Sequence, residues 1–175
     1  MNAKQLMIGL GFSMLAVAGA PALAADAKTL PGAACQPNSN NPTAFYIGSN
    51  GVLINNSDTA LTVICPIVRD VMAANSSNGI SNAQIYVVDN NNSTNDPRVS
   101  CTLESRTTGA GLVEALTDNS VAGASPNVQV LDNYTNLGSS SEGYYFFRCT
   151  IPGNQTVGAQ INRSSIVMYR WSETD

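Results

Sequence analysis

The most informative feature of the sequence is what it lacks. Its 175 residues include no histidine, and charged residues make up 11% of them, less than half the usual share of about 25%. Without histidine, the chain has no Ser-His-Asp triad, no cysteine–histidine nucleophile and no histidine metal ligand. Lysine and arginine together number 8, too few for the basic surface that nucleic-acid binding needs. The sequence therefore argues against nucleic-acid partners and against most common catalytic routes.

Residues 1–24 have the pattern of a signal peptide. Lys4 lies in a short first segment, an apolar run follows, and Ala22-Leu23-Ala24 supplies the small-x-small motif that signal peptidase accepts. An uncleaved membrane anchor is the alternative, but the apolar run is shorter than the span of about 20 residues that a membrane requires. We expect cleavage after Ala24, no membrane insertion afterwards, and a secreted or periplasmic protein of bacterial type.

The chain has four cysteines, an even number that predicts two disulfides in an exported protein. Three pairings are open. We prefer Cys35–Cys65, which would tie down the N-terminal segment, together with Cys101–Cys149, which would join two buried strands. No CxxC motif is present, so a metal site built on these cysteines is not expected.

Beyond the leader, the chain alternates between short apolar runs and polar turns rich in asparagine, of which the sequence has 20. Residues 25–42 contain little apolar material and predict an extended N-terminal segment. Residues 43–175 predict a single domain, in which Asn50-Gly51 forms a type I′ hairpin turn and Arg69–Asn75 form one or two helical turns. Seven clear strands are predicted at 43–48, 52–55, 61–68, 83–89, 97–105, 144–151 and 165–171. Residues 106–142 are hard to interpret, with short strands expected at 111–116 and 128–131.

No segment keeps a helical period for 12 residues, so the chain predicts an all-β fold. We expect an antiparallel, disulfide-braced β-sandwich of about seven to nine strands, with an immunoglobulin-like or jelly-roll-like order. A closed β-barrel is the runner-up.

One polar loop resembles a calcium loop in its spacing of oxygen-bearing side chains. Asp89, Asn91, Ser93 and Asn95 stand at alternate positions, and calcium prefers six to eight oxygen ligands. An EF-hand calcium loop also needs glycine at its sixth position and glutamate at its twelfth, where this chain has Thr94 and Ser100. The absence of both residues favours a solvated loop without a cofactor.

Aromatic side chains are the best candidates for stacking on a ligand such as a sugar ring. Trp171 and Tyr169 have the same parity on the last predicted strand and therefore share a face. Tyr144 lies on the face of its strand opposite Cys149, and Tyr134 is a further candidate. Packing in the core is the alternative role for all four.

The composition favours a binding protein over an enzyme. We expect an exported, non-catalytic module that recognises a polysaccharide or a surface protein through polar loops on a braced scaffold. The first alternative is a structural or assembly subunit of a surface or pilus-like structure, which would self-associate, for example by strand addition. The second is a carboxylate- or calcium-dependent enzyme that uses Glu104, Glu114 or Asp118.

Overall fold

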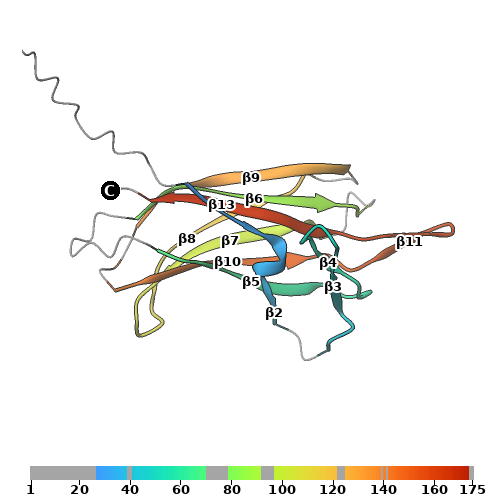
Figure 1. Cartoon of the computed structure of the whole chain (residues 1–175), viewed down its shortest axis with the longest axis horizontal. Helices are drawn as coiled ribbons and strands as arrows, with labels where there is room; N and C mark the ends of the chain where they lie inside the picture. Colours follow the sequence, from blue (N-terminus) through green and yellow to red (C-terminus); the bar gives the residue numbers. More distant parts are fainter. Residues whose placement is uncertain are drawn as a thin grey trace, which may run out of the picture.

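The computed structural model shows an all-β protein built from two antiparallel sheets packed face to face (Figure 1). The structure describes residues 27–38, 41–69, 79–91, 97–121, 125–138, 140 and 142–173. The sheets do not close into a barrel, so the predicted sandwich is confirmed and its runner-up is wrong. The predicted signal peptide and residues 70–75 of the predicted helical turn lie outside the described residues.

Each sheet mixes strands from distant parts of the chain. Sheet A has the order β3-β4-β13-β6-β9, with β1 also paired to β13, and sheet B has the order β2-β5-β10-β7-β8. The strands of sheet A are β1 (Ala27–Pro31), β3 (Phe45–Ile47), β4 (Leu53–Asn55), β6 (Ile80–Asp89), β9 (Ser125–Leu137) and β13 (Ser165–Glu173). Those of sheet B are β2 (Gln36–Pro37), β5 (Leu61–Ile67), β7 (Ser100–Arg106), β8 (Leu112–Asn119) and β10 (Tyr144–Ile151). A separate hairpin of β11 (Gln155–Val157) and β12 (Gln160–Asn162) projects from one end of the sandwich (Figure 1).

The core lies between the two sheets, and an aromatic cluster joins them at its centre. Phe147 of β10 points inward, and its ring makes edge-on contacts with Tyr134 of β9 and Tyr169 of β13, at centroid distances of 5.1 and 6.0 Å. Each such contact contributes about 0.5–1.5 kcal/mol beyond the burial of the rings. The buried hydroxyl of Tyr134 donates to the carbonyl of Cys101 at 2.8 Å, so burial of this polar atom is compensated.

The four cysteines form the disulfides Cys35–Cys65 and Cys101–Cys149, the pairing preferred from the sequence. Cys101 and Cys149 lie opposite each other on the neighbouring strands β7 and β10. Each disulfide stabilises the folded state by about 2–4 kcal/mol. The two disulfides indicate an oxidising, extracellular or periplasmic environment. In the described part of the chain, no helix is long and apolar enough to cross a membrane.

Residues 27–38 supply a strand to each sheet, where the sequence indicated only an extended lead-in. β1 pairs with β13 from Ala27 opposite Ser172 to Pro31 opposite Met168, and β2 pairs with β5. A short 3₁₀ turn, Gly32–Ala34, connects them. The sequence signal is weak because β1 is an edge strand with no fully buried side chain.

The hairpin predicted at Asn50-Gly51 is present between β3 and β4, but its turn is not type I′. That turn needs positive φ at both central residues, whereas Gly51 has a φ of 78° and Asn50 does not share this conformation. The amide of Gly51 donates to the carbonyl of Gly48, and the amide of Gly48 donates to the carbonyl of Val52, both at 2.9 Å. These bonds define a longer loop that ends in a glycine bulge.

Candidate functional site

Two of the predicted stacking residues, Tyr169 and Trp171, are core residues. Tyr169 is fully buried and Trp171 is 3% exposed, and their rings stack with centroids 5.9 Å apart at an interplanar angle of 20°. The Tyr169 hydroxyl donates to the carbonyl of Pro66 at 2.8 Å, and burial raises the pKa of this hydroxyl to about 12. The prediction that these rings stack on a ligand is therefore corrected: they do share a face, but it is the inner one.

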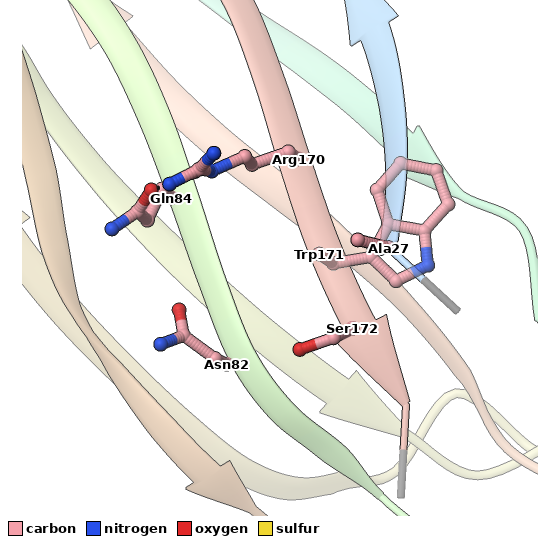
Figure 2. Close-up of a pocket in the computed structure, with 6 residues that line it drawn as sticks. All are labelled: Ala27, Asn82, Gln84, Arg170, Trp171 and Ser172. Atoms are coloured by element: carbon pink, nitrogen blue, oxygen red, sulfur yellow. Dashed lines mark hydrogen bonds between the residues drawn. The ribbon is translucent and has the colours of Figure 1, made fainter. Parts of the chain in front are cut away.

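Figure 2 shows the surface that lies beside Trp171. The indole extends toward β1, while Arg170 and Ser172 leave β13 on the other side, with Gln84 and Asn82 of β6 nearby. This outer surface of sheet A holds a hollow of about 180 Å³, smaller than the range of about 300–1,000 Å³ typical of ligand sites. Arg170 Nε and the Tyr86 hydroxyl both donate to Gln84 Oε1, at 2.6 and 3.1 Å, so this oxygen is already paired.

Tyr144 is the predicted stacking residue that the structure leaves on the surface, with 43% of its area exposed. It begins β10 on the outer face of sheet B, and its ring stacks on that of Phe146, with centroids 5.9 Å apart and an interplanar angle of 21°. The guanidinium groups of Arg148 and Arg106 lie 5.6 and 5.9 Å from the centre of the Phe146 ring. We call Tyr144, Phe146, Arg148, Arg106 and Glu104 the Tyr144 platform.

Glu104 holds the two arginines of the platform in place. Its Oε1 accepts a hydrogen bond from Arg148 Nε at 2.7 Å, and its Oε2 accepts one from Arg106 Nε at 2.7 Å. Arg106 also donates to the carbonyl of Ala110. Arg148 uses only Nε, so within the described residues its two terminal amino groups have no partner, and its side chain is 45% exposed. The platform carries one more positive than negative charge on an acidic protein.

We expect this cluster to contribute stability that disappears in acid. Burial alone would raise the pKa of the Glu104 carboxyl, but hydrogen bonds from Arg148 and Arg106 and their charges outweigh burial and lower it. A carboxyl with a lowered pKa in the folded state stabilises the fold above its unfolded pKa, and this contribution is lost as the pH falls through the folded pKa. Glu104→Gln should therefore lower the melting temperature at about pH 7 and change it little at about pH 2, as thermal unfolding at both pH values would show. Equal losses at the two pH values would contradict the assignment.

Asp89, the first residue of the predicted calcium loop, is buried and fully engaged with protein donors. Its Oδ1 accepts the amide of Asn91 at 3.0 Å and the hydroxyl of Ser164 at 3.3 Å, and its Oδ2 accepts the amide of Val99 at 3.2 Å and the hydroxyl of Ser120. The carboxylate thus joins the ends of three loops. Of the other predicted ligands, Asn91 is described, whereas Ser93 and Asn95 lie outside the described residues. Among the residues that the structure places, no group of three or more acidic, cysteine or histidine side chains is arranged to hold a metal ion.

The acids on β8 hold the neighbouring edge of sheet A. Asp118 Oδ2 accepts the backbone amides of Asp132 and Asn133 at 3.0 and 3.2 Å, and Glu114 Oε2 accepts that of Gly138 at 2.6 Å. Both carboxylates therefore act as backbone partners for β9. The structure does not bring Glu104, Glu114 and Asp118 to one centre: Glu104 lies on the outer face of sheet B, and the other two face β9.

Three members of the platform, Phe146, Arg148 and Arg106, were not predicted, although the sequence carries a signal for two of them. Phe146 and Arg148 have the same parity as Tyr144 in a strand whose opposite face holds Cys149, so alternation places them beside Tyr144. Arg106 and Glu104 come from β7, and only the register Tyr144 opposite Arg106 and Phe146 opposite Glu104 brings them together. That register depends on tertiary pairing, which the sequence pattern does not specify.

No protein-family model and no curated protein matches the chain. Solved structures with a similar arrangement include a family two carbohydrate esterase from Cellvibrio japonicus (5% identity, TM-score 0.45), the isomalto-dextranase of Arthrobacter globiformis T6 complexed with panose (13%, 0.42) and an arabinose-bound α-L-arabinofuranosidase (11%, 0.41). They cover 85%, 83% and 80% of this chain, which in turn covers 34%, 23% and 23% of theirs. The chain thus spans about a third or less of the length of these structures. At these TM-scores the likeness carries no argument about the ligand of this chain.

Proposed function

We propose that this protein is an exported, non-catalytic β-sandwich module that binds a polysaccharide through the Tyr144 platform. The observation that carries the proposal is the exposed ring of Tyr144, stacked on the buried ring of Phe146 beside the unpartnered terminal amino groups of Arg148. An exposed aromatic face suits the apolar face of a sugar ring, and guanidinium groups supply donors for its hydroxyls. Because the platform lies on paired strands, little conformational freedom is lost on binding.

The three acids considered for catalysis are engaged in structural contacts, which supports a function without a catalytic step. A general acid in glycoside hydrolysis needs a raised pKa, whereas the pKa of Glu104 is lowered by its arginine partners. One oxygen of Asp118 accepts backbone amides of β9, and one oxygen of Glu114 accepts the amide of Gly138 just after it. Recognition of a polymer by a flat, rigid surface needs none of these groups to exchange a proton.

The test is retention of the purified, oxidised protein on a panel of insoluble polysaccharides. We expect retention on at least one polymer and a loss of about tenfold or more in affinity in Tyr144→Ala, as for a central aromatic contact. Tyr86→Ala is the matched control, because Tyr86 is a half-buried tyrosine on the outer face of sheet A, stacked against Arg170. It should bind like the wild type.

Two outcomes would overturn the proposal. Absence of retention on every polymer would exclude polysaccharide and leave the surface-protein ligand or the assembly subunit as the function to pursue. An equal loss in the Tyr144 and Tyr86 variants would show that retention is unspecific and does not use the platform.

A further inference from the structure

A second concave surface lies at the other end of β10, where the chain leaves Ile151. Three segments far apart in sequence form a hollow of about 420 Å³, within the range of about 300–1,000 Å³ typical of small-molecule sites. We call it the loop-end hollow, and define it by Thr43, Asn56, Asp58, Asn154, Thr156 and Ile161. One wall is the β11–β12 hairpin that projects from the sandwich (Figure 1).

A buried asparagine fixes the segments that form the hollow. Asn55 is fully buried, and its amide nitrogen lies within hydrogen-bond distance of the carbonyls of Thr59, Ile151 and Pro152, at 3.0, 3.1 and 2.9 Å. Its Oδ1 accepts the amide of Ser57. One side chain thus joins the β4–β5 loop to the end of β10, so the hollow is preformed before any ligand arrives.

Gly153 permits the close contact between these two segments. A Cβ on this residue would lie 2.3 Å from the carbonyl oxygen of Asp58, so only glycine lets the backbones approach this far. The amide of Asn154 then donates to the carbonyl of Ser57 at 2.7 Å. This approach places Asn154 and Asp58 in the lining of the same hollow.

The lining has hydrogen-bonding capacity that the protein does not use. The carboxylate of Asp58 is exposed and has no donor or cation partner within the described ranges. The buried Oδ1 of Asn154 likewise accepts no hydrogen bond from the residues that are placed. Thr156 adds an exposed hydroxyl, and Ile161, which is 51% exposed, adds an apolar wall.

Arg163 lies beside the hollow and is bonded to one of its lining residues. Arg163 Nε donates to Asn56 Oδ1 at 3.1 Å, and its guanidinium lies 6.0 Å from the centre of the Tyr46 ring. Tyr46 is 42% exposed but, like Arg163, is not among the residues that line the hollow. A single carboxylate, several amides and hydroxyls, and an aliphatic wall suit a neutral polyhydroxyl ligand better than an anion.

We propose that the loop-end hollow is a second binding site, which takes an uncharged sugar unit. A hydroxyl of the sugar donates to the Asp58 carboxylate, and its apolar face packs against Ile161. The site shares its class of ligand with the proposed function but uses none of the residues of the Tyr144 platform, so either site can exist without the other.

The test uses NMR of the full oxidised protein titrated with glucose, galactose, mannose or xylose. We expect at least one sugar to shift the amides of residues 56–58 and 154–161. In Asp58→Ala the affinity should fall about tenfold, as for the loss of a hydrogen bond to a charged group. Asp58 is exposed and its side chain has no partner in the described residues, so this variant should fold normally. Asp132→Asn, which removes an exposed charge on β9, is the matched control and should bind like the wild type.

A second variant separates this site from the platform. Tyr144→Ala should keep the sugar-induced shifts at the loop-end hollow even if it loses retention on polymers. Shifts confined to residues around Tyr144 would overturn the second site and leave the platform standing. No shift with any of the four sugars would also overturn it, as would calcium alone shifting the same amides in an Asp58-dependent way.

Discussion

Replacing Trp171 with alanine is expected to lower the free energy of unfolding by about 3–5 kcal/mol, the usual cost of truncating a large buried aromatic residue. The indole is 3% exposed and stacks on Tyr169 at the centre of sheet A. Its removal leaves a cavity beside β1, whose Lys28 is paired opposite Trp171. For a domain of this size the melting temperature should fall by about 10 °C, as measured by thermal and urea unfolding.

The control for this prediction is the exposed aromatic residue. Tyr144→Ala should change the free energy of unfolding by less than about 1 kcal/mol, because 43% of the area of Tyr144 is exposed. A Trp171→Ala protein that unfolds like the wild type but no longer binds a polymer would reverse the assignment and restore Trp171 as a ligand-contacting residue.

Asp89→Ala is the other substitution for which a large effect is expected, a loss of at least about 3 kcal/mol of stability. The side chain is 2% exposed, and its oxygens accept the amides of Asn91 and Val99 and the hydroxyls of Ser120 and Ser164. Without the carboxylate, buried donors lose their acceptor, which costs more than the hydrogen bonds contribute. Urea unfolding of the oxidised protein measures this loss.

Asp58→Ala is the natural comparison for Asp89→Ala. Both substitutions remove an aspartate near the same end of the sandwich, but Asp58 is exposed and has no side-chain partner in the described residues. Its loss should cost less than about 0.5 kcal/mol. Similar effects of the two substitutions would contradict the role of Asp89 as the carboxylate whose hydrogen bonds join the three loops.

The strands that were predicted best are those with a regular pattern along their whole length. β5 and β10 were expected at 61–68 and 144–151 and occur at Leu61–Ile67 and Tyr144–Ile151. In β5 every second side chain is buried without interruption. This uninterrupted period of two predicts both the strand and which of its faces points inward. The cysteine pairing followed from the same property, because alternation placed Cys65, Cys101 and Cys149 on inner faces.

β9 was largely missed, because irregular pairing breaks its alternation. The register with β6 shifts between Ala83 and Ile85 and again between Val88 and Asp89. As a result Asp132 and Asn133 are both exposed, between the buried Leu131 and Tyr134. A bulge reverses the parity of every residue beyond it, so a period of two cannot be followed along this strand from the sequence.

The error on Trp171 has a related cause. Alternation correctly put Tyr169 and Trp171 on one face of β13, but it does not say which face is inward. A register shift between Ile166 and Met168 changes the parity within the strand, so that Ile166 and Tyr169 are both fully buried. The inward face is decided by the opposite sheet, through contacts such as that of Tyr169 with Phe147.

The carboxylates of β8 also affect how molecules of this protein meet one another. Asp118 and Glu114 occupy the backbone amides of Asp132, Asn133 and Gly138, along the outer edge of β9. An open strand edge is a template for aggregation, and charged side chains placed on it are a recurrent protection. A strand from another molecule would have to displace both carboxylates and lie against their charge. Sheet A is thereby protected from polymerisation along the C-terminal half of β9.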